Sequence, residues 1–150
     1  MTTTSMTQAE CEEFLVQPLI AVISIPEPGR GPLTVPVWYY YEPGGDLCIW
    51  TGSKSHKGRL LSSAVRISVC VQDPKPPYKY VSIEGPVSIE PAQFERDVRP
   101  LALRYFGVEG GEDYLASIGG SAGVADDILV RLHPDRWLSV DYSKLGPLPK

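Results

Sequence analysis

Cysteine and histidine are scarce in this sequence. The three cysteines are Cys11, Cys48 and Cys70, and the two histidines are His56 and His133. An odd number of widely spaced cysteines argues against a disulfide framework and against a zinc motif. Neither histidine has a cysteine, aspartate or glutamate at a metal-ligand spacing. The sequence therefore predicts no bound metal and a reducing, cytoplasmic environment.

Long apolar runs are also missing. None approaches the ~20 residues that a membrane-spanning helix needs. Residues 1–8 contain neither a basic residue nor an apolar run, unlike a secretory signal. The start of the chain is rich in Thr and Ser, which predicts a flexible tail over residues 1–9. The length of 150 residues and the hydrophobic fraction of 43% suit one globular domain over residues 1–150.

Familiar catalytic motifs are absent as well. The sequence has no Gly-x-Ser-x-Gly nucleophile elbow, no Walker loop and no dinucleotide-binding glycine pattern. Two pairs of adjacent carboxylates, Asp126 with Asp127 and Glu12 with Glu13, should point different ways, and we expect them on the solvated surface. Since no side-chain pattern in the sequence indicates acid–base or nucleophilic chemistry, an enzymatic reaction here would depend on a cofactor.

The charge is negative overall but unevenly distributed. A net charge of −4 disfavours binding to nucleic acid. Residues 51–83 nevertheless hold six basic residues and one acidic residue, a local charge of +5, so the remainder carries −9. A basic block in an acidic protein is a candidate binding site for an anionic ligand. A solvated charged surface is the alternative, and the block alone does not decide between the two.

Short apolar and alternating segments recur along the chain. We expect strands at residues 19–25, 33–41, 47–51, 65–71, 80–90, 128–132 and 136–142. Turns rich in Pro and Gly join several of them, as at residues 26–32 and 42–46. Alternation is typical of antiparallel sheets. The predicted fold class is therefore mainly β, an antiparallel closed or split β-barrel with a few peripheral helices.

Helical patterns occupy other segments. We expect helices at residues 10–17, 53–63, 93–106 and 109–118, followed by a small-residue loop at 119–123. Pro100 must kink or divide the third helix, because its ring removes a backbone hydrogen bond.

The first candidate ligand segment is a strand with a proline inside it, Pro36, followed by Val37 and Trp38. A proline cannot donate to the strand ladder, so one side of the strand is locally unpaired there. A planar ligand could use the exposed backbone groups. An edge strand that proline guards against aggregation is the alternative.

The second candidate segment follows a strand and leads into a helix. It contains Trp50, Thr51, Lys54, Ser55, His56 and Lys57, with Gly52 at the turn. Hydroxyls, free backbone N–H groups and lysines at a helix start suit a phosphate. A simple Ser N-cap is the alternative. The third segment is the proline-rich loop with Tyr78 and Lys79, which could stack on a ring or bind an anionic tail, or be a packed loop.

These three segments, in this order, resemble the pyridoxamine 5'-phosphate oxidase-like split-barrel superfamily. The matching stretches are TVPVWYYY, WTGSKSHKGRLLSSAVRISVCVQDPKPPYKYVSIEG and RLHPDRWLSVDY, and the resemblance covers residues 14–142. The segment Asp-Pro-x-Pro-Pro-Tyr, the following Val-x-Ile-Glu-Gly and the terminal Arg-Trp-x-x-x-Asp-Tyr are most similar to the actinobacterial deazaflavin-dependent reductases, which use coenzyme F420.

The resemblance implies an FMN-binding type of split barrel, with six to seven strands, that works as a homodimer and holds two cofactors at the dimer interface. It places the cofactor ring against the backbone at Pro36, Val37 and Trp38. It places the phosphate on Thr51, Ser55 and Lys57. It implies that Tyr78, Lys79 and Trp137 reach the cofactor from the other subunit.

The remaining members of the predicted cofactor site are Trp50, Lys54 and His56. Relatives often carry Arg or Lys where this chain has His56. A histidine there is mostly neutral at cytoplasmic pH, which weakens the anion site unless a bound phosphate raises its pKa.

The activity implied is hydride transfer from reduced F420 to an unsaturated or conjugated small molecule. FMN is an alternative cofactor, since it also has a tricyclic ring and a phosphate. Lys75 and Lys79 favour F420, whose polyglutamate tail is anionic. A non-catalytic binder of F420, flavin or a tetrapyrrole is the third hypothesis. No proton donor is assigned, and Tyr78 and His56 are the candidates.

Overall fold

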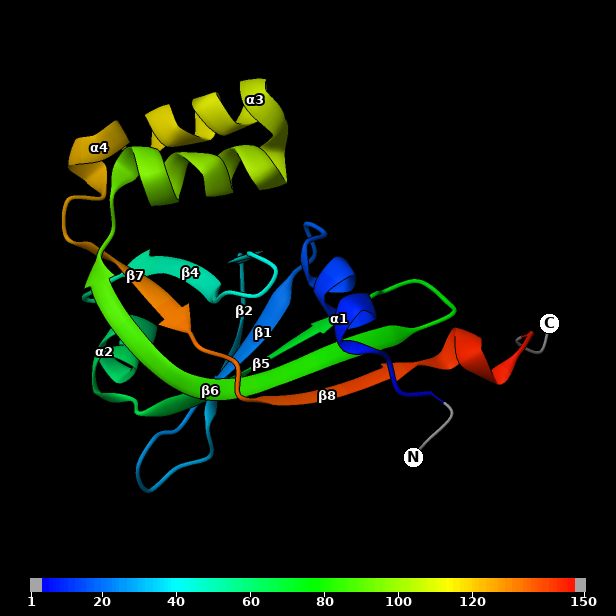
Figure 1. Cartoon of the computed structure of the whole chain (residues 1–150). Helices are drawn as coiled ribbons and strands as arrows, with labels where there is room; N and C mark the ends of the chain where they lie inside the picture. Colours follow the sequence, from blue (N-terminus) through cyan, green and yellow to red (C-terminus); the bar gives the residue numbers. More distant parts are fainter. Residues whose placement is uncertain (1–3, 148–150) are drawn as a thin grey trace.

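The computed structural model describes residues 4–147, and its centre is an antiparallel sheet curled into a half-barrel (Figure 1). Its eight strands are β1 (Ala21–Ile25), β2 (Leu33–Val37), β3 (Tyr40–Tyr41), β4 (Leu47–Gly52), β5 (Arg66–Gln72), β6 (Lys79–Pro91), β7 (Asp127–Leu132) and β8 (Arg136–Asp141). The strand order is β2-β1-β5-β6-β7-β4-β3, and β8 pairs with β6. The predicted mainly antiparallel β fold is confirmed.

The long strand β6 connects the two halves of the sheet. Its first part pairs with β5 and β8, and its last part pairs with β7. Gly85 lies where the strand passes from one half to the other. A Cβ atom at this position would lie 1.8 Å from the carbonyl oxygen of His133, so the approach of the two backbones requires glycine.

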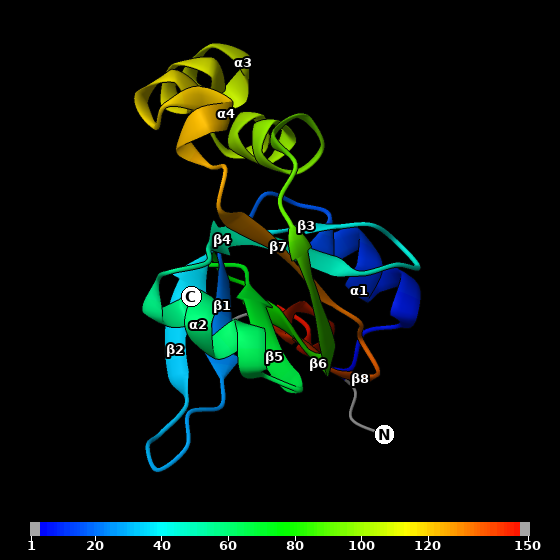
Figure 2. The same cartoon turned by 90° about the vertical axis from the view of Figure 1, so that its left-hand side faces the viewer.

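Helices accompany the barrel at several places. They are α1 (Gln8–Leu15), α2 (His56–Ser63), the π-helical turn η1 (Phe94–Val98), α3 (Arg99–Ser117), α4 (Gly120–Gly123) and the 3-10 turn η2 (Tyr142–Leu145). The segment η1–α3–α4 forms a helical hairpin that stands above the sheet between β6 and β7 (Figures 1 and 2). The two ends of this insertion are neighbours, because the N–H of Ala92 donates to the carbonyl of Asp127 at 2.9 Å.

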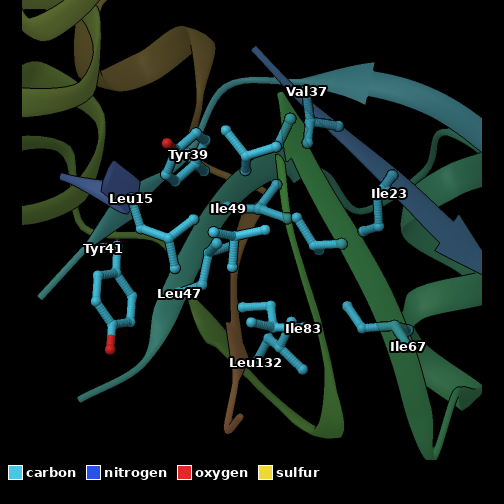
Figure 3. Packing of buried hydrophobic residues seen from close by; sticks show 14 of the residues in the cluster. Leu15, Ile23, Val37, Tyr39, Tyr41, Leu47, Ile49, Ile67, Ile83 and Leu132 are labelled. Carbon is cyan, nitrogen blue, oxygen red and sulfur yellow. The ribbon is translucent and has the colours of Figure 1, made fainter. Parts of the chain in front are cut away.

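The hydrophobic core fills the interior of the barrel. Figure 3 shows side chains from several strands and from α1 that point toward one another, among them Leu15, Ile23, Leu47, Ile67 and Leu132. Strand alternation produces this arrangement, since every second residue faces inward. A second, smaller cluster of Val98, Ala102, Leu115 and Val124 lies within the helical hairpin.

The single strand predicted over residues 33–41 is wrong. The chain breaks at Trp38 and Tyr39 into β2, which pairs with β1, and β3, which pairs with β4. The N–H of Tyr39 donates to the hydroxyl of Tyr105 at 3.1 Å instead of joining a strand ladder. Passage from one half of the sheet to the other therefore interrupts a β-branched and aromatic segment that predicts one continuous strand.

Helices form in each of the four predicted segments, and one further α-helix was not predicted. Pro100 divides the segment as expected, and it lies in the first turn of α3, where its missing N–H costs no hydrogen bond. The break between the two later helices is at Gly107, whose φ is 76°. Residues 119–123 are not a loop as predicted, because Gly120–Gly123 forms the short helix α4. At Gly123, a Cβ atom would lie 1.8 Å from the carbonyl oxygen of Ile118.

The start of the described chain is attached to the barrel. The N–H of Met6 donates to the Ser139 hydroxyl at 3.0 Å, and the N–H of Asp141 donates to the Thr4 carbonyl at 2.8 Å. Thr7 and Glu10 then form a capping box at the start of α1. Residues 4–9 of the predicted tail are thus tied to β8 and α1, and residues 1–3 lie outside the described range. Within that range, no helix combines the length and hydrophobicity that crossing a membrane requires.

Candidate cofactor site

A cleft of about 440 Å³ is lined by residues from the ends of β2 and β4. Six of the residues that the sequence predicts for a cofactor site line it: Pro36, Val37, Trp38, Trp50, Thr51 and Lys57. The first two candidate segments, which are separated by a hairpin in the sequence, therefore meet at one cleft. This volume falls within the range of about 300–1,000 Å³ that is usual for small-molecule sites.

Lys57 is brought to the cleft by the close approach of α2 to the end of β4. A Cβ atom at the next residue, Gly58, would lie 2.0 Å from the carbonyl oxygen of Gly52, so only glycine permits this contact. The Lys57 ammonium has no acidic partner in the described range, and burial lowers its pKa from the ordinary value. An unpaired, half-buried ammonium at the edge of a cleft is suited to an anionic ligand.

Three other residues of the second segment do not line this cleft. The Ser55 hydroxyl is the N-cap of α2: it accepts from the N–H of Gly58 and donates to the carbonyl of Gly52, both at 2.9 Å. His56 pairs with Glu27 at 3.0 Å. Lys54 is exposed, and its ammonium lies 3.8 Å from Asp126. Lys57 is therefore the cationic residue of this turn that the fold directs into the cleft.

The third segment and Trp137 also lie away from the cleft of the same chain. Tyr78 is exposed in the loop between β5 and β6. The Lys79 ammonium lies 4.0 Å from Asp141 and over the ring of Phe14. Trp137 packs edge-on against Tyr41 beside the barrel core. Their predicted action from a second subunit stays a prediction.

Asp127 forms part of the structure that supports the cleft, which corrects the expectation that this carboxylate is merely solvated. Its Oδ2 accepts a hydrogen bond of 2.7 Å from Nε1 of Trp50, which fixes the indole on the cleft wall. Partial burial raises the pKa of Asp127, although the Trp50 N–H opposes this effect. Glu12 is a second correction, since it accepts from the Tyr41 hydroxyl and from the N–H of Gly44, both at 2.7 Å.

Aromatic side chains from the helical hairpin surround Trp38. The Tyr105 ring stacks on the indole at 5.0 Å and 8°, and the rings of Phe106 and Tyr114 contact it at 5.1 and 5.4 Å. Tyr105 also donates to the carbonyl of Leu19 at 2.7 Å. These contacts attach α3 to the barrel beside the cleft and hold Trp38 in one orientation.

Sequence reasoning missed Ile20 and Tyr114, which line the cleft, and Gly52 was noted there only as a turn residue. Ile20 precedes β1 and looks like any apolar residue of that run. Tyr114 comes from the far arm of α3, and no local pattern marks it. The adjacent aromatic residues Tyr105 and Phe106, directly before Gly107, are the one sequence feature that could have drawn attention to this wall.

The fold is that of the pyridoxamine 5'-phosphate oxidase-like split-barrel proteins. The conserved hypothetical protein Rv2991 from Mycobacterium tuberculosis is similar to this chain with a TM-score of 0.79 and 24% identity, over 100% of this chain and 93% of that one. A structure described as an F420 reductase has a TM-score of 0.70 and 23% identity, over 85% and 94% of the two chains.

A third similar structure is the FAD and heme binding protein from Mycobacterium smegmatis, with a TM-score of 0.69 and 16% identity, over 99% of this chain and 76% of that one. No family model matches the sequence, and no curated protein sequence matches it either. At these identities the likeness establishes the shared fold and not the ligand.

Proposed function

We propose that the cleft binds a flavin-type cofactor, F420 in the first place, and that the chain is an F420-dependent reductase of an unsaturated or conjugated small molecule. The observation that carries the proposal is the half-buried Lys57 ammonium, which has no acidic partner within residues 4–147 and lies at the edge of an aromatic cleft. The likeness to a structure described as an F420 reductase supports the same choice.

The residues of the cleft fit such a group. Trp38 and Trp50 provide apolar surface for a tricyclic ring, and Lys57 provides a cation for a phosphate. The Thr51 hydroxyl has no hydrogen-bond partner in the described part of the chain, so it is free to donate to the same phosphate. When bound, the reduced cofactor supplies the hydride, and the chain contributes orientation and the exclusion of water.

Two alternatives remain to be separated from F420 by experiment. FMN shares the ring and the phosphate, so the same cleft can accept it. A non-catalytic carrier of a flavin or tetrapyrrole is favoured by a specific observation, because the cleft wall contains no carboxylate and no histidine within the described range. A structure of the same fold is described as an FAD and heme binding protein, and these are ligands of the kind that this alternative names.

The test of cofactor binding is a titration of the purified protein with F420 and, separately, with FMN. Two of the three tryptophans, Trp38 and Trp50, line the cleft, so a bound ring should quench their fluorescence. Tighter binding of F420 supports the proposed cofactor, and tighter binding of FMN selects the alternative. If neither compound quenches the emission, the central proposal fails.

The phosphate site is tested by Lys57→Met, which keeps most of the apolar stem and removes the charge. We expect cofactor binding to weaken by roughly 1.5–3 kcal/mol, as for the loss of a charged hydrogen-bond partner. Lys54→Met is the matched control, because this nearby lysine is exposed and does not line the cleft. Equal affinities of Lys57→Met and the parent protein would contradict the assigned site.

Catalysis is tested with reduced F420 and a panel of enones and biliverdin. Oxidation of F420 that depends on both protein and substrate supports the reductase. If F420 binds tightly and stays reduced throughout, the carrier alternative replaces it.

We also propose that two copies pair through the outer face of β2, β1, β5, β6 and β8. The strand register places five outward-facing residues in one row across this face: Pro36, Val22, Cys70, Ser82 and Leu138. Leu138 is 60% exposed and Val22 is 37% exposed, which is unusual for apolar residues in the middle of a strand. Pro36 belongs to both the row and the cleft, so a second copy would lie beside the cofactor.

A further inference from the structure

Tyr114 is one of two ionisable side chains on the described wall of the cleft, and Lys57 is the other. Its hydroxyl has no hydrogen-bond partner within residues 4–147. The one buried side-chain polar atom without a partner in this range is Nε of Arg104, so the Tyr114 hydroxyl is open to solvent. A polar group of this kind in a cleft is available to a ligand.

The ring that carries this hydroxyl is held in place from two sides. It contacts Trp38 at 5.4 Å and Phe106 at 5.2 Å between ring centroids. The neighbouring Leu115 is buried in the hairpin. One turn earlier, Gly111 packs directly on the facing arm of α3, where a Cβ atom would lie 2.9 Å from Cα of Leu103. The hydroxyl is therefore presented from a rigid support.

The two polar groups of the cleft suit different chemistry. The Lys57 ammonium is a charged group for an anion, whereas the Tyr114 phenol is a neutral donor, well matched to a carbonyl oxygen. Trp38, which already stacks on Tyr105, extends an aromatic wall next to this donor. The combination favours a flat conjugated ligand with a carbonyl group.

We propose that Tyr114 is a catalytic residue that binds the carbonyl oxygen of a flat α,β-unsaturated carbonyl substrate and supplies the proton for its reduction. The inference rests on the proposed function, which provides the hydride. The substrate gains that hydride at its β-carbon, and the electron pair of the C=C bond moves toward the carbonyl to give an enolate. The O–H bond of Tyr114 then breaks as its proton passes to the enolate oxygen that it binds, the resulting enol tautomerises to the saturated carbonyl product, and water reprotonates the phenolate.

Tyr114→Phe tests the hydrogen bond, since the ring contacts with Trp38 and Phe106 remain. Equilibrium dialysis of 9-fluorenone and fluorene against protein saturated with oxidised F420 compares two flat ligands that differ by one carbonyl oxygen. We expect the variant to bind fluorenone about 5- to 10-fold more weakly, as for one neutral hydrogen bond. Fluorene should change by less than about 2-fold. Equal losses for both ligands, or no loss for fluorenone, would overturn the inference.

A kinetic measurement tests the proton transfer. With 2-cyclohexen-1-one as substrate, Tyr114→Phe should lower kcat about 100-fold, the usual contribution of a positioned acid, while F420 affinity changes by less than about 2-fold. An unchanged kcat would exclude Tyr114 as the proton donor.

The two proposals fail in different ways. If F420 and FMN both fail to bind the parent protein, the cofactor proposal is wrong. Dialysis of the cofactor-free protein then still decides the role of Tyr114 in carbonyl binding. If F420 binds and the two dialysis ligands behave alike in parent and variant, the cofactor proposal stands and the Tyr114 proposal is wrong.

Discussion

At the scale of single residues, the Lys57 ammonium should lower the stability of the cofactor-free fold and favour the binding of the proposed anionic ligand. Its ammonium is partly removed from water with no acidic partner in the described chain, and burial lowers its pKa. Such a charge destabilises the folded state until an anion arrives. The same side chain should therefore oppose folding of the cofactor-free protein and favour binding of the cofactor.

Lys57→Met should raise the free energy of unfolding of the cofactor-free protein by ~0.5–1 kcal/mol at pH 7. Because burial lowers the pKa of Lys57 in the folded state, the unfolded chain holds the Lys57 proton more tightly than the folded chain does. The charged ammonium therefore destabilises the folded parent protein fully at neutral pH, and its removal is stabilising. This destabilisation fades as the pH rises through the lowered pKa toward the ordinary value of 10.5. Urea unfolding at pH 7 and near pH 10 measures the difference, and a constant gap, or a less stable variant, would contradict this account.

Some residues of the cleft and its support could be predicted from the sequence, and others could not. Trp50, Thr51 and Lys57 were predictable because a strand end, a glycine and a helix start follow one another within eight residues. Tyr114 was not, because tertiary packing of a distant helix brings it to the cleft. Asp127 was assigned to the solvated surface because no local pattern shows that a tryptophan N–H lies 2.7 Å away.

At the scale of elements, the folding of the two arms of α3 against each other depends on the backbone conformation of Gly107. Gly107 has φ 76° and ψ 179°, a conformation that is essentially restricted to glycine. It separates the arm that carries Tyr105 and Phe106 from the arm that carries Tyr114. The composition of residues 93–118 therefore predicts two helical pieces correctly, whereas the fold of one arm against the other depends on contacts that the sequence does not display.

Gly107→Ala should destabilise the protein by about 1–3 kcal/mol through backbone strain alone, because no atom lies within 4 Å of the new Cβ. Gly110→Ala is the matched control in the next turn. Its Cβ would meet Cβ of Phe106 at 3.4 Å, and alanine favours helix, so we expect a neutral or slightly stabilising effect. Thermal unfolding of both variants decides the point. Equal stabilities would mean that the left-handed conformation at Gly107 is not maintained.

The break between β2 and β3 shows a different limit of sequence analysis. β-branched and aromatic residues continue through residues 33–41, and the pattern of a single strand carries no information about its neighbours. The choice of β1 as partner before Trp38 and of β4 after Tyr39 is made by the whole sheet. The β character of residues 33–41 was thus predictable, and the division into two strands with different partners was not.

At the scale of the whole molecule, the proposed homodimer gives a direct test. Leu138→Lys places a charge at the β8 end of the exposed row, on its most exposed apolar residue, so the dimer should dissociate to monomers in analytical ultracentrifugation. Val108→Lys is the control, because this residue is 72% exposed and belongs to the helical hairpin instead. A parent protein that sediments as a monomer, or a Leu138→Lys dimer as stable as the parent, would contradict the proposed interface.

The helical hairpin between β6 and β7 is an insertion with its own apolar cluster. Its two ends, Ala92 and Asp127, are joined by a backbone hydrogen bond of 2.9 Å, and its small apolar cluster is separate from the barrel core. The barrel can therefore accommodate insertions of other lengths at this point without new strand pairings. Since this hairpin supplies Tyr114 to the cleft wall, a change in its length or sequence would alter the shape of the cleft and leave the strand pairings of the barrel unchanged.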